Sequence, residues 1–147
     1  MSEAASADGA ALLFSKIDYA SLNARQQENY NFHKLAARLA EYGYNCLRLT
    51  DDWQGADLIA CHIDGSAFLR VQLKGRLVVD KKYVGKEIYV AFFDAEHCYV
   101  YPHDAFLETL LARGSMDEQS RVWVETGLRS WPITPAWAKE FLADYSV

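Results

Sequence analysis

The sequence has little cysteine and little proline, and it has no long apolar run. Among its 147 residues there are three cysteines and three prolines. Cys46, Cys61 and Cys98 form no CxxC pair, so we interpret them as small buried apolar residues in a reducing compartment. Every apolar run is far below the roughly 20 residues needed to cross a bilayer. These absences exclude a disulfide framework and a transmembrane helix.

Other absences restrict where in the cell the protein is expected and which kinds of enzyme or nucleic-acid-binding protein it can be. The first residues, MSEAASADGAALLF, lack the basic region of a secretory signal, so we expect a cytoplasmic protein with no membrane partner. The four histidines show neither an HExxH motif nor a His–Cys spacing, which argues against a zinc enzyme. The net charge of −5 excludes a polycation that binds nucleic acid through its total charge.

The composition is that of a globular protein. Hydrophobic residues make up 51% of the chain and charged residues 24%, and the length fits one domain over 1–147. No repeat or low-complexity linker interrupts it beyond residues 1–10, which are rich in Ala and Ser and which we expect to be flexible.

Apolar periodicity predicts helices and strands in a mixed order. Phe32, Leu35, Leu39 and Tyr42 form the stripe of an amphipathic helix over 23–42. The expected strands are 44–50, 56–63, 66–74, 87–94 and 97–102, with a possible short strand in RVWVE, and later helices start at His103 and Pro135. This order predicts an α/β fold: a mixed central β-sheet with an Asp-Gly hairpin, flanked by helices on both faces.

The hairpin at Asp64-Gly65 brings three polar side chains together. A two-residue turn there places Asp57 directly opposite Gln72, with Lys74 two residues further along the same face. Ile59, Cys61 and Phe68 share this face, so we expect it to be covered mainly by protein. A slip of one residue would separate the polar group, so the prediction depends on the register.

A carboxylate on the first helix completes the candidate site. Glu28 lies one turn before Phe32 on the same helix face. Two carboxylates, an amide and a lysine form a hard-oxygen site for Mg²⁺, with Mn²⁺ as a substitute, beside a cation that stabilises charge. These residues predict phosphodiester chemistry. Taken singly, Gln72 also reads as an ordinary hydrogen-bonding residue and Glu28 as an exposed helix acid.

These residues resemble the PD-(D/E)XK, or restriction-endonuclease-like, nuclease superfamily from about residue 26 to 102. The matching pieces are the helix ending in LAARLAEYGYNC, GADLIA with Asp57, and LRVQLKGR with Gln72 and Lys74. The resemblance implies that Asp57 binds metal, that Gln72 binds metal or water, that Lys74 positions the water, and that Glu28 completes the site. Gln72 replaces the family's acid, as in the QxK variant of small homing endonucleases. The family's helix glutamate commonly lies one turn nearer the GY, where this chain has Phe32 and His33.

Positive charge gathers next to this candidate site. Residues 70–86 hold six basic residues and one acid, a net charge of +5, whereas the rest of the chain carries −10. We expect this segment to contact the phosphate backbone, the alternative being an ordinary solvated loop. Trp53 could touch a nucleotide, although packing is favoured, and Tyr83 could stack or pack. The expected nucleic-acid contacts are Arg70, Arg76, Lys81, Lys82 and Lys86.

Two functions remain open at this point. The first is a Mg²⁺-dependent DNA endonuclease, whose substrates would include branched or displaced strands and which would need a homodimer or larger assembly to cut two strands at once. The second is a non-catalytic nuclease-fold subunit that binds DNA or assembles a DNA-processing or defence complex. Gln72 and the acidic total favour the second function, and the joint presence of Asp57 and Lys74 favours the first.

Overall fold

The computed structural model describes residues 13–114 and 120–147. Residues 1–10, which the sequence predicts to be flexible, lie outside this range. The chain divides into two compact units, Met1–Asn31 and Phe32–Val147. The prediction of one domain over the whole chain stays a prediction.

The first unit contains η1 (Tyr19–Ser21) and the start of α2 (Ala24–Ala40). Asn23 and Gln26 form a reciprocal cap, because each side chain accepts a hydrogen bond from the other residue's backbone N–H at 2.9 Å. This cap explains why the helix begins within one residue of the predicted position. The helix ends at Ala40, two residues before the predicted Tyr42, which is exposed.

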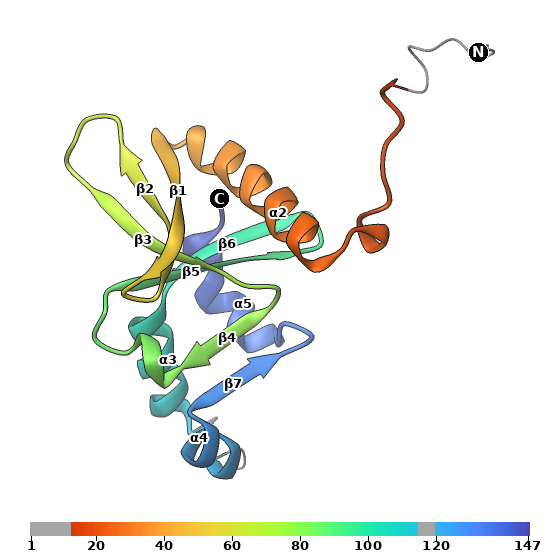
Figure 1. The fold of residues 1–147 in the computed structure, drawn as a ribbon. Coiled ribbons are helices and arrows are strands. Elements are labelled where there is room, and N and C mark those ends of the chain that lie inside the picture. Colours follow the sequence, from red (N-terminus) through yellow and green to blue (C-terminus); the bar gives the residue numbers. More distant parts are fainter. Residues whose placement is uncertain (1–12, 115–119) are drawn as a thin grey trace. The chain divides into compact units, whose positions relative to one another are not determined.

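The second unit is built on a mixed sheet of five strands (Figure 1). Neighbouring strands follow the order β1-β2-β3-β5-β6, and only the β3–β5 pair within this sheet is parallel. The strands are β1 (Tyr44–Trp53), β2 (Ala56–His62), β3 (Phe68–Leu73), β5 (Ile88–Asp94) and β6 (His97–Pro102).

Residues 74–87 form the crossover that parallel strands require. The sequence predicts only a basic loop here, but the segment contains β4 (Leu77–Asp80) and η2 (Lys81–Tyr83). β4 pairs with the distant strand β7 (Leu128–Trp131) in a separate two-stranded sheet. Leu77, Val78 and Val79 are almost fully buried, so apolar residues anchor the crossover while its charged residues stay at the surface.

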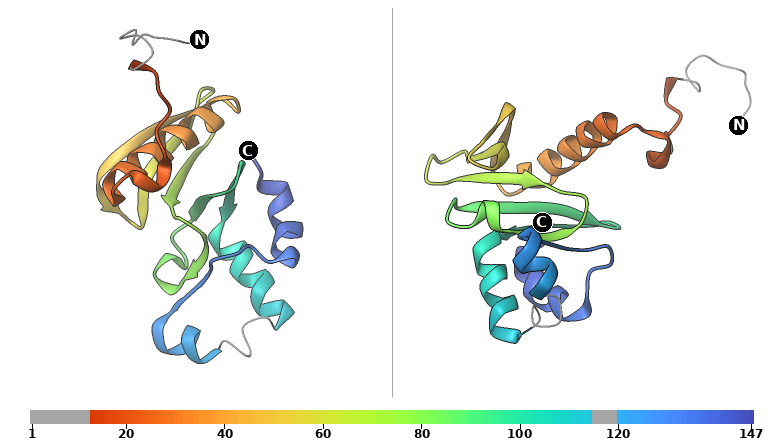
Figure 2. Two further views of the ribbon diagram at one scale, coloured as in Figure 1. Left: turned by 90° about the vertical axis from the view of Figure 1, so that its right-hand side faces the viewer. Right: turned by 60° about the horizontal axis from the view of Figure 1, so that its bottom comes forward.

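Helices cover both faces of the five-stranded sheet (Figure 2). From Phe32 onward, α2 packs Leu35 and Leu39 against β2, β3, β5 and β6. On the other face lie α3 (His103–Arg113) and α5 (Ala136–Leu142), which η3 (Ala143–Tyr145) follows. The predicted α/β fold with a mixed, helix-flanked sheet is confirmed. No helix in the described part of the chain is long and apolar enough to span a membrane.

The prediction of a short strand in RVWVE is wrong, because this segment belongs to the helix α4 (Ser120–Thr126). Gly127 follows the helix with a φ of 69°, and its N–H donates to Trp123 O at 2.7 Å. A glycine in the left-handed region is the usual end of a helix. The strand in this region is β7, which begins at Leu128, two residues after the end of α4.

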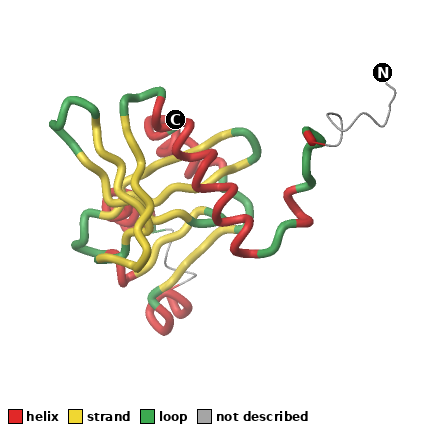
Figure 3. The backbone as a smooth tube through the Cα atoms, turned by 45° about the horizontal axis from the view of Figure 1, so that its top comes forward, coloured by secondary structure: helices red, strands yellow, loops and turns green. Residues whose placement is uncertain are grey.

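The β2–β3 hairpin has the predicted register but a longer turn (Figure 3). Leu58 pairs with Val71 and Cys61 with Phe68, while Ile63 and Ser66 lie outside the ladder. Ser66 instead donates backbone and hydroxyl hydrogen bonds to Asp64, which lower the pKa of that carboxyl to about 2. Because this side-chain turn captures Ser66, the predicted two-residue turn is wrong although the strand register is right.

Candidate nucleic-acid and metal site

Asp57 and Gln72 lie side by side at the end of the hairpin away from the turn. Gln72 Nε2 donates to Asp57 Oδ2 at 2.8 Å, and the backbone N–H of Leu73 donates to the same oxygen at 3.1 Å. Both side chains are half-buried. The predicted contact between Asp57 and Gln72 is therefore confirmed by this hydrogen bond, next to Leu58–Val71, the last pair of the β2–β3 ladder.

Lys74 directly follows β3 and points towards a buried aromatic ring. Its backbone N–H donates to Ala91 O at 2.8 Å, and its Nζ lies 5.8 Å from the centre of the Tyr83 ring. Lys82 Nζ lies 5.3 Å from the same ring centre. Each ammonium group therefore lies within cation–π distance of the Tyr83 ring.

The sequence leaves open whether Tyr83 stacks or packs, and in the structure it is a packing residue. It is 2% exposed. Burial, followed by the negative charges of Asp80, Asp57 and Asp52, raises the pKa of its phenol. The hydroxyl thus stays protonated near neutral pH, and the residue serves as a neutral support for the lysines. No periodicity in its segment signals this position.

Glu28 belongs to the first compact unit and is exposed on α2. Its predicted role as a second carboxylate stays a prediction. Asp57 is the carboxylate that accepts a hydrogen bond from Gln72.

The basic residues of the 70–86 segment divide into different environments. Arg70 lies on β3, and its Nη1 donates to Lys86 O at 3.0 Å, which fixes the guanidinium against the end of the crossover. Lys81 and Lys82 are exposed on η2, but Lys81 Nζ lies 5.3 Å from the ring centre of Trp123, away from the Tyr83 contact of Lys82. Arg76 is exposed before β4, and Lys86 is half-buried.

The face that carries Arg70 and Gln72 is more open than the sequence predicts. Phe68 is 62% exposed and Leu47 52% exposed, so the expectation that protein mainly covers this face is wrong near the hairpin. Trp53 is 48% exposed, and the Arg70 guanidinium lies 5.0 Å from its ring centre. The helices α3 and α5 pack against the apolar residues of β5 and β6, so within the described part of Phe32–Val147 no helix covers these exposed side chains of the β1–β3 face.

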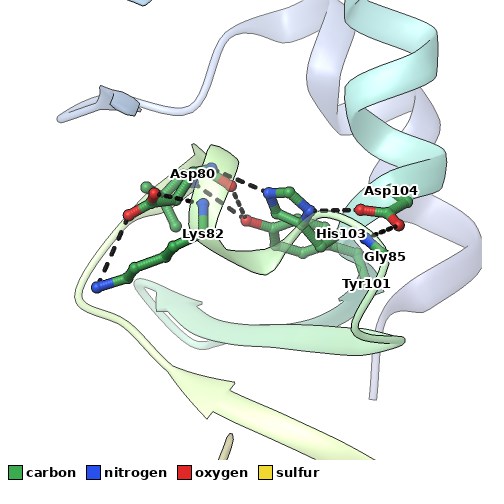
Figure 4. Close-up of polar contacts among 7 residues, drawn as sticks. Asp80, Lys82, Gly85, Tyr101, His103 and Asp104 are labelled. Carbon is green, nitrogen blue, oxygen red and sulfur yellow. Dashed lines mark hydrogen bonds and ion pairs between the residues drawn. The ribbon is translucent and has the colours of Figure 1, made fainter. Parts of the chain in front are cut away.

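A buried histidine network holds the crossover to the start of α3 (Figure 4). His103 is fully buried, and its Nε2 accepts a hydrogen bond from Asp80 N at 2.9 Å. Its Nδ1 therefore carries the proton and faces Asp104 Oδ1 at 2.9 Å, while Asp104 Oδ2 accepts from Gly85 N at 2.9 Å. Sequence reasoning missed this network, since it considered histidine only as a metal ligand.

The donor chemistry at Asp57 fits Mg²⁺ only with help from a substrate. Within the described ranges, no three His, Cys, Asp or Glu side chains gather as a metal site. The donor set at the hairpin is one carboxylate and one amide oxygen, both hard ligands of the kind that Mg²⁺ takes together with water and substrate phosphate. This donor set is compatible with such a shared site and too sparse for a site built of protein ligands alone.

Comparisons with known proteins give a limited likeness. No family model matches the sequence, and no curated protein matches it. Among solved structures, the chain is similar to Hjc, a Holliday junction resolvase from the archaeal hyperthermophile Archaeoglobus fulgidus. The match has a TM-score of 0.40 and 20% identity, and it covers 48% of this chain and 74% of the resolvase.

Proposed function

We propose that this chain is a restriction-endonuclease-like, metal-dependent nuclease that hydrolyses DNA phosphodiester bonds. The observation that supports this most is the 2.8 Å contact between Gln72 and Asp57, two residues from Lys74, at the start of a segment of net charge +5. A carboxylate and an amide in contact, with a lysine two residues further along the chain, match the chemistry that a phosphate diester needs.

Each side chain has a distinct role in this proposal. Asp57 and the amide oxygen of Gln72 would hold Mg²⁺, with Glu28 as a further ligand, and the bound ion would lower the pKa of a water molecule and polarise the phosphate. Lys74 positions the attacking water or the phosphate, because Tyr83 restrains its ammonium group. Arg70, Arg76, Lys81, Lys82 and Lys86 bind the backbone. Cutting two strands in one event would require a homodimer or a larger assembly.

The test is a Mg²⁺ and Mn²⁺ titration with supercoiled plasmid, branched DNA and a matched RNA. We expect wild type to nick DNA, and Lys74→Ala to lower the rate at least about 100-fold, within the range that a positioned proton-transfer group contributes. Lys139→Ala is the matched control, since this exposed lysine faces Asp94 on another part of the sheet. Absence of metal-dependent cleavage by wild type would contradict the proposal.

A second candidate function is a non-catalytic subunit that binds DNA. The observation in its favour is that the Gln72 amide and the Leu73 N–H both donate to Asp57 Oδ2, so the protein itself compensates the carboxylate. DNA binding that is equal in EDTA and Mg²⁺, without cleavage, would favour this function over the nuclease.

A further inference from the structure

The uncovered part of the β1–β3 face presents aromatic rings and an arginine in one line. Phe68, Arg70 and Gln72 alternate along β3, so they share one face, with each about 6.6 Å from the next. The Arg70 guanidinium lies 5.0 Å from the ring centre of Trp53. The line therefore begins at the Asp57–Gln72 pair and ends at an aromatic side chain that is 62% exposed.

An open cavity adjoins this line. Its volume is about 600 Å³, and its lining includes Phe68, Arg70, Tyr89 and Pro102. This volume lies within the range of small-molecule sites, which are mainly apolar with a few polar groups that fix orientation. The lining also contains Glu87 and Asp104, and two carboxylates make the cavity unsuitable for a phosphate. A neutral, planar group such as a nucleobase fits this combination of an acid-rimmed cavity, aromatic rings and a guanidinium.

We propose that Trp53, Arg70 and Phe68 form a stacking platform for unpaired nucleobases. Bases in a duplex are stacked on each other, so only a single strand, a flap or a displaced strand offers a free base face to such a platform. The inference rests on the proposed function and names its substrate class: the strand bound next to Asp57, Gln72 and Lys74 is single-stranded.

The contacts around Arg70 explain why the platform is ready for a ligand. Its Nη1 is held by Lys86 O, so the guanidinium plane is fixed before any base arrives, and less conformational entropy is lost on binding. Charge agrees with this assignment, because the basic crossover that contains Lys86 supplies phosphate contacts beside the platform. Arg70 serves both, since its guanidinium plane stacks on a base while its remaining N–H groups donate to the phosphate backbone.

The experiment measures stacking in EDTA, where no metal-dependent cleavage occurs. The probe is a single-stranded oligothymidine with one 2-aminopurine, compared with the same strand in a blunt duplex, and the readouts are anisotropy and 2-aminopurine quenching. We expect Trp53→Ala and Phe68→Ala each to weaken single-strand binding at least about 5-fold, the low end of what a stacked base contributes, and to change duplex binding less than about 2-fold. Trp53→Phe should keep most of the quenching.

Two exposed side chains provide matched controls. Tyr42→Ala removes an aromatic ring that is 53% exposed, and Ile63→Ala removes an apolar side chain at the hairpin turn that is 81% exposed. Neither should alter single-strand binding. Circular dichroism melting of every variant checks that the fold is intact.

The outcomes separate this inference from the proposed function. Unchanged single-strand affinity in Trp53→Ala and Phe68→Ala, or an equal loss for duplex, overturns the platform while DNA cleavage stands. Retained stacking by a wild type that cleaves nothing contradicts the nuclease and supports the platform. A dimer in sedimentation equilibrium that Phe68→Ala dissociates, with single-strand binding unaffected, assigns the face to a second copy of the chain and overturns the inference.

Discussion

A single residue, Gln72, determines the charge balance of the candidate site. Its Nε2 and the Leu73 N–H donate to the same Asp57 oxygen, so the pair is stable as a hydrogen-bonded unit without a cation. An acid at position 72 would bring a second carboxylate oxygen within about 3 Å of Asp57, where like charges repel strongly unless a metal lies between them. In the proposed metal site, this amide would lower the metal affinity and stabilise the metal-free state.

Gln72→Glu should have the opposite effects: it should raise the metal affinity and lower the stability of the metal-free state. In EDTA we expect the free energy of unfolding to fall by about 1.5–3 kcal/mol, because a hydrogen bond to a charged group is replaced by repulsion. Mn²⁺ should restore most of this loss and raise the melting temperature more than it does in wild type. Urea denaturation and calorimetric Mn²⁺ titration measure both effects.

The control for this prediction is Gln54→Glu, which adds the same charge at an exposed glutamine in the β1–β2 turn. It should not change the melting temperature by more than about 1 °C in EDTA. If Mn²⁺ stabilises neither wild type nor Gln72→Glu, the carboxylate and amide do not form a metal site, and the non-catalytic function is the better explanation.

The elements that the sequence predicts correctly depend on neighbouring residues. The Asp57–Gln72 contact follows from one hairpin, whose register is kept by the alternation of buried and exposed residues even though its turn is longer than predicted. The amphipathic helix follows from its own stripe, of which Leu35 and Leu39 are buried. Local patterns of this kind require no knowledge of distant segments.

The elements that the sequence does not predict depend on distant partners. β4 is a strand because it pairs with β7, some 50 residues later in the chain. No pattern within residues 77–80 indicates that this partner exists. Tyr83 and His103 acquire their roles only when the crossover folds against the start of α3. The apolar, β-branched V-W-V of the RVWVE segment fits a strand by local preference, whereas in the structure it lies in α4, which ends before Gly127.

His103 should stabilise the crossover more than any local feature of it. His103→Ala removes the acceptor for Asp80 N and the partner of Asp104 inside a fully buried site. We expect the free energy of unfolding to fall by about 2–4 kcal/mol, because the cost of losing a buried hydrogen bond and the cost of creating a cavity add together. Urea denaturation measures it, with the exposed His33→Ala as the control, which should stay within about 0.5 kcal/mol. A cost below about 1 kcal/mol for His103→Ala would contradict the supporting role of the network.

Charge is distributed unevenly over the whole molecule, and this determines how binding responds to salt. The 70–86 segment is the basic part of an acidic chain, so it should dominate the salt-dependent part of nucleic-acid affinity. Lys81→Ala with Lys82→Ala should weaken binding to all sequences and lower the slope of log affinity against log salt by about 2, one for each lost phosphate contact.

The matched control for the salt slope is Lys34→Ala with Lys139→Ala, which removes the same charge elsewhere in the chain. Fluorescence anisotropy between 50 and 200 mM salt, on the order of the range where such slopes are measured, compares the two double variants. An equal slope for both would remove the crossover from the interface. If the Lys81→Ala and Lys82→Ala pair lowers the slope of log affinity against log salt by only about 1, Lys82 is the residue that contacts phosphate. This result would agree with the position of Lys81 against Trp123.

The crossover between β3 and β5 has a consequence for how this protein can change over generations. Two parallel strands cannot be joined by a tight turn, so deletion of residues 74–87 would break the sheet, and the buried Leu77, Val78 and Val79 would leave a hole in the core. Topology therefore sets a minimum length for the basic segment, whereas it does not constrain the segment's surface charges. A descendant that no longer binds nucleic acid should keep the segment at full length with its apolar residues and exchange its lysines and arginines for neutral side chains.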